Sequence, residues 1–258
     1  EVALPAPNVA ATPRNALAKT RPAPDRTDAN VAFEQIIVTA QRRAEQSQKV
    51  PVSVSAFTGD ALAQAGIRKV MDLQQVDSSL TLSAQSGVVI PFLRGVGNFT
   101  ATTGNEAPVA TYLDEVYYPS PAGSTLSYNH LERVEVLKGP QGTLFGRNAA
   151  GGVINVVTKE PTSTPHIDFS VGYANYNTIT SDFYGTTGIA PGLNADLSLH
   201  YQNQADGWGK NLFDGSPTYL SREWSGRSKW VYTPSDDWKF RFIADYDRTL
   251  NDESATLN

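Results

Sequence analysis

The sequence of 258 residues contains no cysteine, a single methionine and no long apolar run. The lack of cysteine excludes disulfide bonds and thiolate metal sites. A membrane-spanning helix requires about 18 to 20 consecutive apolar residues, and no stretch approaches that length. The opening letters "EVALPAP" lack a basic start and an apolar core. We therefore expect either a cytosolic protein or one from which a signal peptide has been removed.

The charged residues exclude further classes of function. The net charge is −5 and the lysines and arginines are scattered, so no nucleic-acid-binding face is predicted. The three histidines, His130, His166 and His200, lack the spacing of metal ligands. No Gly-x-Ser-x-Gly motif is present. We expect no enzyme, no cofactor and no dedicated metal site.

Glycine (20 residues) and aromatic residues (10%) are frequent, which favours strands and turns over packed helices. The chain divides into three zones. Residues 1–33 are rich in Pro, Ala and Thr without an apolar period, which predicts a flexible tether. Residues 34–161 mix strand and short-helix signals and predict a small α+β domain. From His166 onward, the segments alternate between apolar and polar residues.

The middle zone begins with an alternating segment at Pro51–Phe57. A short helix is predicted to follow, with Asp60 as its N-cap and Gly66 as its C′ residue. Further strands are predicted by apolar and β-branched runs. These runs are Val109–Tyr118, Leu131–Leu137 and Gly152–Lys159.

The third zone consists of alternating segments of about ten residues, the length of a transmembrane β-strand. In the first of them, Ile167, Phe169 and Val171 share one face. Aromatic residues lie near the ends of the apolar faces, and tight turns alternate with a long connection at Asp206–Ser221. These two features favour a membrane barrel over a soluble antiparallel sandwich. About five strands cannot close a barrel, so we expect the missing strands beyond Asn258.

A glycine-rich stretch, "LERVEVLKGPQGTLFGRNAAGGVINVVTKEP", runs from Leu131 to Pro161. A phosphate-binding loop would require Gly-Lys followed by Ser or Thr, which this stretch lacks. No dinucleotide-binding Gly-x-Gly-x-x-Gly is present either. We interpret the glycines as architectural, since they permit tight turns and close backbone approach.

This stretch resembles the plug domain of TonB-dependent outer-membrane receptors. Pro91–Gly97 ("PFLRGVG") and Val109–Tyr118 ("VATYLDEVYY") precede it in the order of that family, and Glu34–Arg43 ("EQIIVTAQRR") is similar to a TonB box. The resemblance covers the chain beyond the tether. It implies a periplasmic tether at 1–33, a TonB box region at 34–43, a plug domain at 44–161 and, at 166–258, about five strands of a 22-stranded antiparallel barrel.

The resemblance also implies a function. Such receptors import cargo actively across the Gram-negative outer membrane, and their partners are outer-membrane lipid and TonB of the inner-membrane TonB-ExbB-ExbD complex. The commonest cargo is a ferric siderophore, in which iron arrives within a chelate and is no cofactor of the protein. A vitamin, carbohydrate or aromatic cargo is the alternative within the same mechanism. A passive porin or adhesin-like barrel and a soluble β-rich binding protein are alternatives of other classes.

The TonB-binding segment is expected at Ile36, Ile37, Val38, Thr39 and Ala40. This short β-branched run lies beside the predicted tether, and its backbone groups are expected to be free to add as a strand to the edge of a partner's sheet. The alternative is a first strand paired within the domain.

Two arginines, Arg94 and Arg147, match plug arginines that pair in this family with glutamates of the barrel wall. Arginine suits that role because its fork binds a carboxylate through two hydrogen bonds. The glutamates are expected beyond residue 258. The chain departs from the family at Asp114–Glu115, where Asp-Gly is common. A positive φ is less favourable for glutamate than for glycine, so the hairpin geometry expected from Asp-Gly does not follow directly here.

Cargo contact is expected on the outward turns of the plug, at Ala84–Val88, Asn98–Thr103 and Tyr117–Pro121. These turns combine small residues with polar and aromatic groups suited to recognition. The alternative is that some of these residues pack against the barrel wall. The candidate ligand-binding residues are Gln85, Asn98, Phe99, Tyr117 and Tyr118.

Overall fold

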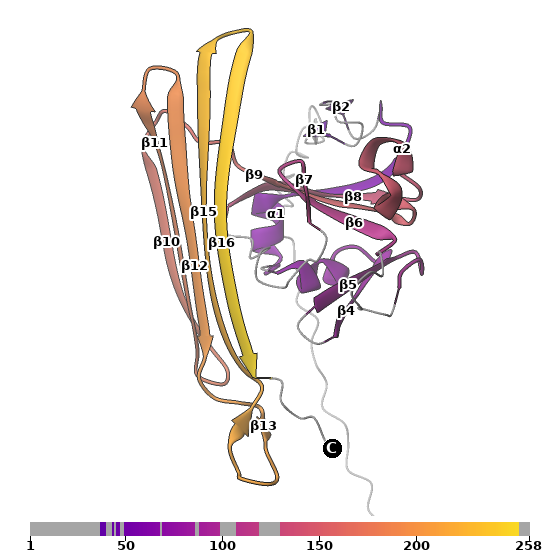
Figure 1. Cartoon of the computed structure of the whole chain (residues 1–258), viewed down its shortest axis with the longest axis vertical. Coiled ribbons are helices and arrows are strands. Elements are labelled where there is room, and N and C mark those ends of the chain that lie inside the picture. Colours follow the sequence, from indigo (N-terminus) through magenta and orange to yellow (C-terminus); the bar gives the residue numbers. More distant parts are fainter. Residues whose placement is uncertain are drawn as a thin grey trace, which may run out of the picture. The chain divides into compact units, whose positions relative to one another are not determined.

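The computed structural model describes residues 37–39, 43, 45–46, 49–67, 69–85, 88–98, 107–118 and 130–252 (Figure 1). All of them belong to the compact unit Gln35–Asn258. The predicted tether at 1–33 and the candidate residues Ile36, Ala40 and Phe99 lie outside the described residues. In the described part, no helix has both the length and the apolarity needed to cross a membrane.

The predicted α+β domain contains a mixed five-stranded sheet, called here the central sheet. Its strand order is β3-β8-β9-β6-β7, and β6 and β9 form its one parallel pair. The segment predicted as one strand at Val109–Tyr118 forms two strands of a hairpin, because the chain turns at Asp114–Glu115. The bounds are β3 Ser53–Thr58, β6 Val109–Leu113, β7 Val116–Tyr118, β8 Leu131–Lys138 and β9 Gly152–Thr158.

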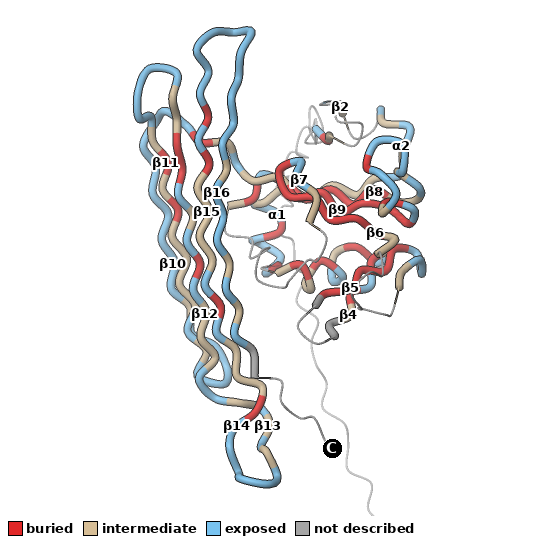
Figure 2. Tube along the Cα trace, viewed as in Figure 1, coloured by how far each residue is buried: buried red, intermediate tan, exposed pale blue. Residues whose placement is uncertain are grey.

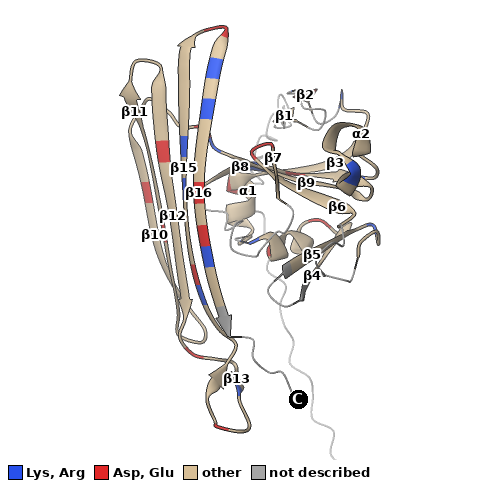
Figure 3. Cartoon of the chain, viewed as in Figure 1, with Lys and Arg blue, Asp and Glu red and all other residues tan. Residues whose placement is uncertain are grey.

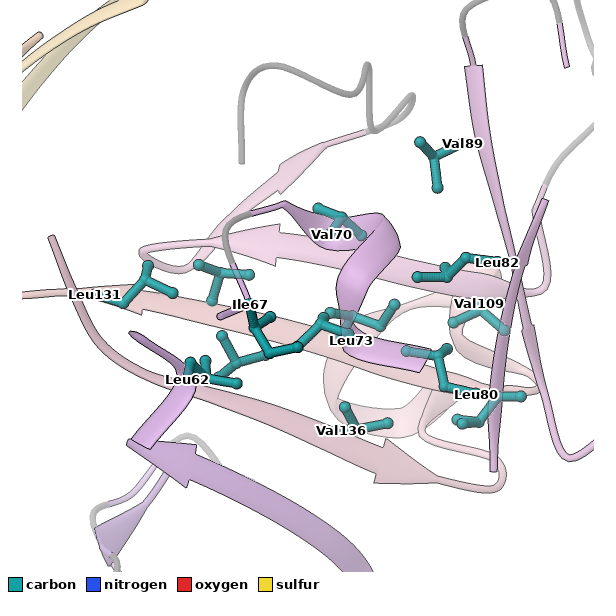
Figure 4. Close-up of a cluster of buried hydrophobic side chains, with 14 of the residues drawn as sticks. Leu62, Ile67, Val70, Leu73, Leu80, Leu82, Val89, Val109, Leu131 and Val136 are labelled. Atoms are coloured by element: carbon teal, nitrogen blue, oxygen red, sulfur yellow. The ribbon is translucent and has the colours of Figure 1, made fainter. Parts of the chain in front are cut away.

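Both faces of the central sheet are covered. Helix α1 (Gly59–Gln64), the 3₁₀ helix η2 (Val70–Gln75) and the hairpin of β4 (Leu80–Gln85) and β5 (Val88–Leu93) supply the larger apolar cluster. Figure 4 shows side chains of this cluster meeting between the helices and the strands. A smaller cluster contains Val38, Ala110, Tyr112, Leu137, Phe145, Ala149 and Val153. Burial on two faces accounts for the nearly continuous apolar runs in β6 and β9.

Two short helical turns, α2 (Gly142–Phe145) and η3 (Arg147–Ala149), connect β8 to β9 within the glycine-rich stretch. Three of its glycines have positive φ, 95° at Gly139, 79° at Gly146 and 147° at Gly152. The architectural interpretation of these glycines fits this geometry, because L side chains rarely adopt such backbone angles.

The capping prediction for helix α1 was half right. Thr58 is the N-cap, since its hydroxyl accepts a hydrogen bond from the Ala61 N–H at 3.2 Å. Asp60 lies in the first turn of the helix, so its prediction as N-cap was wrong. The extended backbone of Thr58 places a hydroxyl three residues before Ala61, the spacing that capping requires. Gly66 follows the C-cap with φ of 74°, as predicted.

The alternating zone forms an antiparallel five-stranded meander, called here the meander sheet. It is open, because β10 and β16 each pair with one neighbour among the described strands. The turns 191–192 and 236–237 lie at one end. The turn 175–177 and the longer connection 205–219 lie at the other, and that connection carries β13 (Gly209–Lys210) and β14 (Pro217–Thr218). The strands are β10 His166–Ala174, β11 Thr178–Ala190, β12 Leu193–Gln204, β15 Leu220–Ser235 and β16 Trp238–Asp252.

The two faces of the meander sheet differ in polarity. On the outer face, large apolar side chains are exposed, among them Ile167 (70%), Phe169 (66%) and Phe242 (66%). The inner face carries charged side chains such as Glu223, Arg227 and Lys229, which are mostly buried. Figure 2 shows exposed stretches interspersed with intermediate and buried ones along this sheet, and Figure 3 shows acidic and basic bands along β15 and β16. The predicted alternation is confirmed.

Candidate functional site

The first described strand is β1 (Ile37–Val38), which lies within the predicted TonB-binding segment. It pairs antiparallel with β2 (Glu45–Gln46), so Ile37 lies opposite Gln46 and Val38 opposite Glu45. The Val38 side chain is fully buried in the smaller apolar cluster, whereas Ile37 is half exposed. The segment is therefore a strand, as its β-branched composition indicated, and here its partner is a strand of the same domain.

Thr39 continues β1 into a polar pocket of the central sheet. Its backbone N–H donates to Glu135 Oε1 at 2.8 Å, and its hydroxyl donates to the same oxygen at 3.1 Å. The hydroxyl also accepts from Arg133 Nη2 at 3.3 Å and from Asn155 Nδ2 at 3.2 Å. Three side chains of two central strands thus converge on one residue of the N-terminal segment.

Glu135 is a fully buried carboxylate in the middle of β8. A buried carboxylate requires charged or hydrogen-bonding partners, since its removal from water is costly. Glu135 accepts from Arg133 Nε at 2.7 Å and from Asn155 Nδ2 at 3.2 Å, in addition to Thr39. Arg133 contacts Glu132 as well. Sequence reasoning missed this cluster, although Arg133 and Glu135, which flank Val134 in the middle of a predicted strand, were a usable signal.

A second charged cluster joins the domain to the inner face of the meander sheet. Asp114, at the tip of the β6–β7 hairpin, accepts from Arg227 Nη2 at 2.7 Å, and Lys229 Nζ lies 3.4 Å away. The Thr158 N–H and hydroxyl also donate to Asp114, at 2.9 and 2.7 Å. Burial alone would raise the pKa of Asp114, but the charge of Lys229, the Thr158 hydrogen bonds and the charge of Arg227 hold this pKa below its ordinary value.

Three more polar contacts link the same two parts. Lys69 pairs with Glu223 at 3.1 Å, and Glu160 pairs with Arg241 at 2.6 Å and with Lys239 at 3.1 Å. Most of these pairs place a carboxylate on the domain and a cation on the sheet. The expected plug–barrel pairs have the opposite polarity, with arginines on the plug.

The two predicted plug arginines lie elsewhere. Arg94 is exposed at positive φ (51°) and donates to Ser53 Oγ at 3.0 Å. Arg147 is exposed and begins η3. Their pairing with barrel glutamates beyond residue 258 stays a prediction.

The candidate cargo-binding residues that the structure describes differ in their hydrogen bonds and in their place in the fold. The Tyr117 hydroxyl accepts from Asn148 Nδ2 at 2.6 Å, and its ring lies 5.6 Å from that of Tyr112. The Tyr118 hydroxyl donates to Asp245 of β16 at 2.9 Å. Burial and this bond to Asp245 raise the pKa of Tyr118 to about 12. Asn98 is half-buried after β5, and Gln85 ends β4. Their role in cargo binding stays a prediction.

Comparisons with known proteins identify the class. Residues 46–153 match the family described as TonB-dependent Receptor Plug Domain. The pesticin receptor of Yersinia pestis is 29% identical over 160 residues, which are 61% of this chain and 24% of that protein. The vitamin B12 transporter BtuB of Vibrio vulnificus is 28% identical over 165 residues, with 61% and 26% covered. The chain therefore spans about a quarter of the length of these curated relatives.

Solved structures agree with this class. The ferric yersiniabactin uptake receptor FyuA from Yersinia pestis superposes with a TM-score of 0.66 at 30% identity, covering 77% of this chain and 32% of that one. The pyoverdine outer membrane receptor FpvA from Pseudomonas aeruginosa PAO1 gives 0.68 at 17% identity, covering 82% and 30%, which shows the fold alone.

The chain thus resembles the siderophore-receptor-like TonB-dependent receptors, and its residues 46–153 match their plug domain. It combines their plug domain with an antiparallel sheet that resembles the start of their barrel. The relatives named here are receptors and a transporter, not enzymes. Within the described residues, no group of three or more acidic or histidine side chains is arranged to hold a metal ion.

Proposed function

We propose that this chain belongs to a receptor that imports its cargo actively across the Gram-negative outer membrane. The observation that carries the proposal is the docking of β1 at the N-terminal side of a plug-domain fold. A strand of two residues, paired with an equally short strand, is suited to leave its site and add to the sheet edge of a partner. TonB of the inner-membrane TonB-ExbB-ExbD complex is the proposed partner, and Ile36 to Ala40 are the proposed binding residues.

The meander sheet supports the proposed location. Its outer face exposes large apolar side chains and its inner face carries charges, which suits a sheet between lipid and a plugged lumen. We propose that the sheet lies in the outer membrane and that the N-terminus is periplasmic. A passive porin or adhesin-like barrel requires neither a plug domain nor a docked β1.

A ferric siderophore is the proposed cargo class. The support comes from relatives such as the ferric yersiniabactin uptake receptor, at 30% identity. A vitamin is the second candidate, because a vitamin B12 transporter matches over a similar share of the chain. A carbohydrate or an aromatic compound is a further alternative cargo, which would be imported by the same mechanism. The proposed cargo contacts are Gln85, Asn98, Phe99, Tyr117 and Tyr118.

The test of active import is deletion of residues 34–40 in the complete receptor. Uptake of labelled cargo, chosen by growth assays with a panel of siderophores and vitamins, should fall to the level of cells without TonB. Cargo binding to whole cells should remain, because the deletion leaves the outward turns intact. Unchanged uptake, with normal amounts of receptor in the membrane, would favour the passive barrel.

Cargo binding on the plug has its own test. Asn98, Phe99 and Tyr118 are changed together to alanine in the complete receptor, and cargo affinity is measured on whole cells. A loss of affinity is expected, because the three changes remove a hydrogen-bonding amide and two aromatic rings. Undiminished affinity at normal receptor levels would place the binding site on the barrel loops alone.

A further inference from the structure

The pocket that receives Thr39 matches a hydroxyl side chain completely. A hydroxyl has one donor and two acceptor sites. In this pocket the Thr39 O–H faces Glu135, and its oxygen accepts from Arg133 and Asn155. Valine has nearly the same shape but would satisfy none of these three groups. The pocket therefore selects a hydroxyl at position 39 and does not merely tolerate it.

The docked position of β1 excludes a partner strand at the same residues. The Thr39 N–H is committed to Glu135, β2 pairs with Ile37 and Val38, and the Val38 side chain is buried. Strand addition requires free backbone groups along an edge. The docked and the partner-paired states of β1 are thus alternatives, and the strength of docking sets how often β1 is available.

The pocket is built to open without loss of the central sheet. When Thr39 leaves, Glu135 keeps its hydrogen bonds from Arg133 and Asn155, so the buried carboxylate still has partners. A cavity of about 80 Å³ lined by Thr39, Tyr112, Glu115, Phe145 and Asn155 adjoins the pocket. It has room for a water molecule to replace the departed hydroxyl.

We propose that Thr39 and the pocket of Arg133, Glu135 and Asn155 form a latch that holds β1 against the plug and sets its availability to a partner strand. The proposal deepens the proposed function and depends on it only for the identity of the partner. Latch opening itself requires neither cargo nor TonB, so it is measurable in their absence.

The test uses the lack of cysteine in these 258 residues. The substitution Val38→Cys places a thiol at a fully buried position of β1, where it reacts only after β1 leaves. The complete receptor is studied in isolated outer membranes without cargo or TonB. Reaction with a water-soluble maleimide is timed, and the signal of the Val38 parent is subtracted.

In the Val38→Cys background, Thr39→Val should speed labelling at least about tenfold, because it removes hydrogen bonds to a charged group. Thr39→Ser keeps the hydroxyl and should restore slow labelling. The matched control is Thr158→Val, which removes a hydroxyl from a different carboxylate, Asp114. This control should leave labelling within about twofold of the unchanged protein.

A second reporter separates the latch from general instability. Val134→Cys places the thiol in the fully buried core of β8. Its labelling should stay slow in the Thr39→Val variant. Labelling at position 38 that does not respond to Thr39→Val overturns the latch. An equal rise at both positions also overturns it, because Thr39 would then support the whole plug. Failure of import with a responsive latch would instead count against the proposed function alone.

Discussion

The central sheet and the meander sheet each have five strands, yet their apolar residues face opposite surroundings. In the central sheet, apolar side chains are buried on both faces, and charged residues such as Glu135 are exceptions held by partners. In the meander sheet, apolar side chains are exposed and charges such as Lys229 are buried. Strand periodicity is common to both, so it identifies strands but not the medium beside them. The medium is identified by which side chains are buried, apolar ones in the central sheet and charged ones in the meander sheet.

Among the substitutions considered, removal of the charged link between the two sheets at Asp114 should lower the free energy of unfolding most. Asp114→Ala removes a carboxylate that is 3% exposed and leaves Lys229, which is 2% exposed, without its charged partner. Removing one member of a buried ion pair costs about 3–5 kcal/mol. We expect a loss of this size in the free energy of unfolding of the plug. The measurement is urea unfolding of the complete receptor, followed by labelling of the buried thiol in a Val134→Cys background.

The control for this prediction is Asp245→Ala. Asp245 pairs with the same guanidinium, that of Arg227, but its side chain is 41% exposed. A loss below about 1 kcal/mol is expected, because water screens an exposed pair. Equal losses in the two variants would mean that burial of Asp114 is not the cause.

The next effect concerns the two faces of one strand. Phe169 and Ser170 are neighbours in β10 and lie on the outer and the inner face. Arginine on a lipid-facing position near the bilayer midplane costs about 2–4 kcal/mol. Phe169→Arg should therefore lower the free energy of unfolding from lipid vesicles by this amount. Ser170→Arg should be nearly neutral, because Asp182 lies opposite on the neighbouring strand β11 and offers a carboxylate to the arginine. In the present structure the Ser170 hydroxyl donates to Asp182 Oδ2 at 3.1 Å.

The assay is the urea dependence of folding into vesicles, read by tryptophan fluorescence. All four tryptophans, Trp208, Trp224, Trp230 and Trp238, lie in the zone from His166 onward. The plug residues contain no tryptophan, so the fluorescence does not report on the plug. A similar cost for both arginine variants would contradict a lipid-facing outer face.

A smaller, pH-dependent effect is expected from His130. Burial, reinforced by the nearby charge of Lys159, lowers the pKa of His130 to about 4 from an ordinary 6.5, while Asp168 and Asp182 act in the opposite sense. The unfolded chain therefore takes up a proton near pH 6.5, and the folded chain does so only near pH 4. The free energy of unfolding should fall as the pH drops through this interval.

The variant His130→Gln should flatten this part of the pH profile. Asp114 interferes little, because its lowered pKa keeps its contribution complete above about pH 5, and most of that contribution is lost only in stronger acid than pH 4. Urea unfolding of the complete receptor at several pH values between 7.5 and 4 is the measurement. Parallel profiles for the two proteins would show that His130 does not carry the effect.

Local features of this fold could be predicted from the sequence. The alternation from His166 onward depends on successive residues, and the C′ position of Gly66 depends on one turn of helix. Thr58 was missed as the N-cap because Asp60, two residues later, is an equally good capping type. Such errors move a boundary without changing the fold.

The charged clusters could not be predicted in the same way. Thr39 and Glu135 are 96 residues apart, and Asp114 and Arg227 are 113 apart. No periodicity relates residues at such distances, since the topology of the sheets brings them together. The family resemblance indicated arginines of the plug as the wall contacts. In the described residues, carboxylates of the plug and cations of β15 and β16 supply most of the contacts with the sheet, and the predicted arginine pairs stay a prediction.

The smallest expected effect is at the hairpin between β6 and β7, where glutamate stands at the position for which the family resemblance implied glycine. Asp114 and Glu115 both have positive φ, 47° and 71°. Aspartate tolerates this conformation, whereas the Cβ of glutamate is strained there. Glu115→Gly should relieve the strain, in part offset by greater freedom of the unfolded chain, for a net gain of about 0.5 kcal/mol.

Loss of the glutamate charge should contribute little to this gain. The Glu115 side chain is 81% exposed and lies 3.8 Å from Arg241, which makes the pair weak. Glu115→Ala is the matched control, because it removes the charge but keeps a Cβ at positive φ. The urea midpoint of the plug, read at the Val134→Cys thiol, should rise for glycine and not for alanine. An equal rise for both would attribute the gain to the charge, and the backbone of this hairpin would then be unstrained.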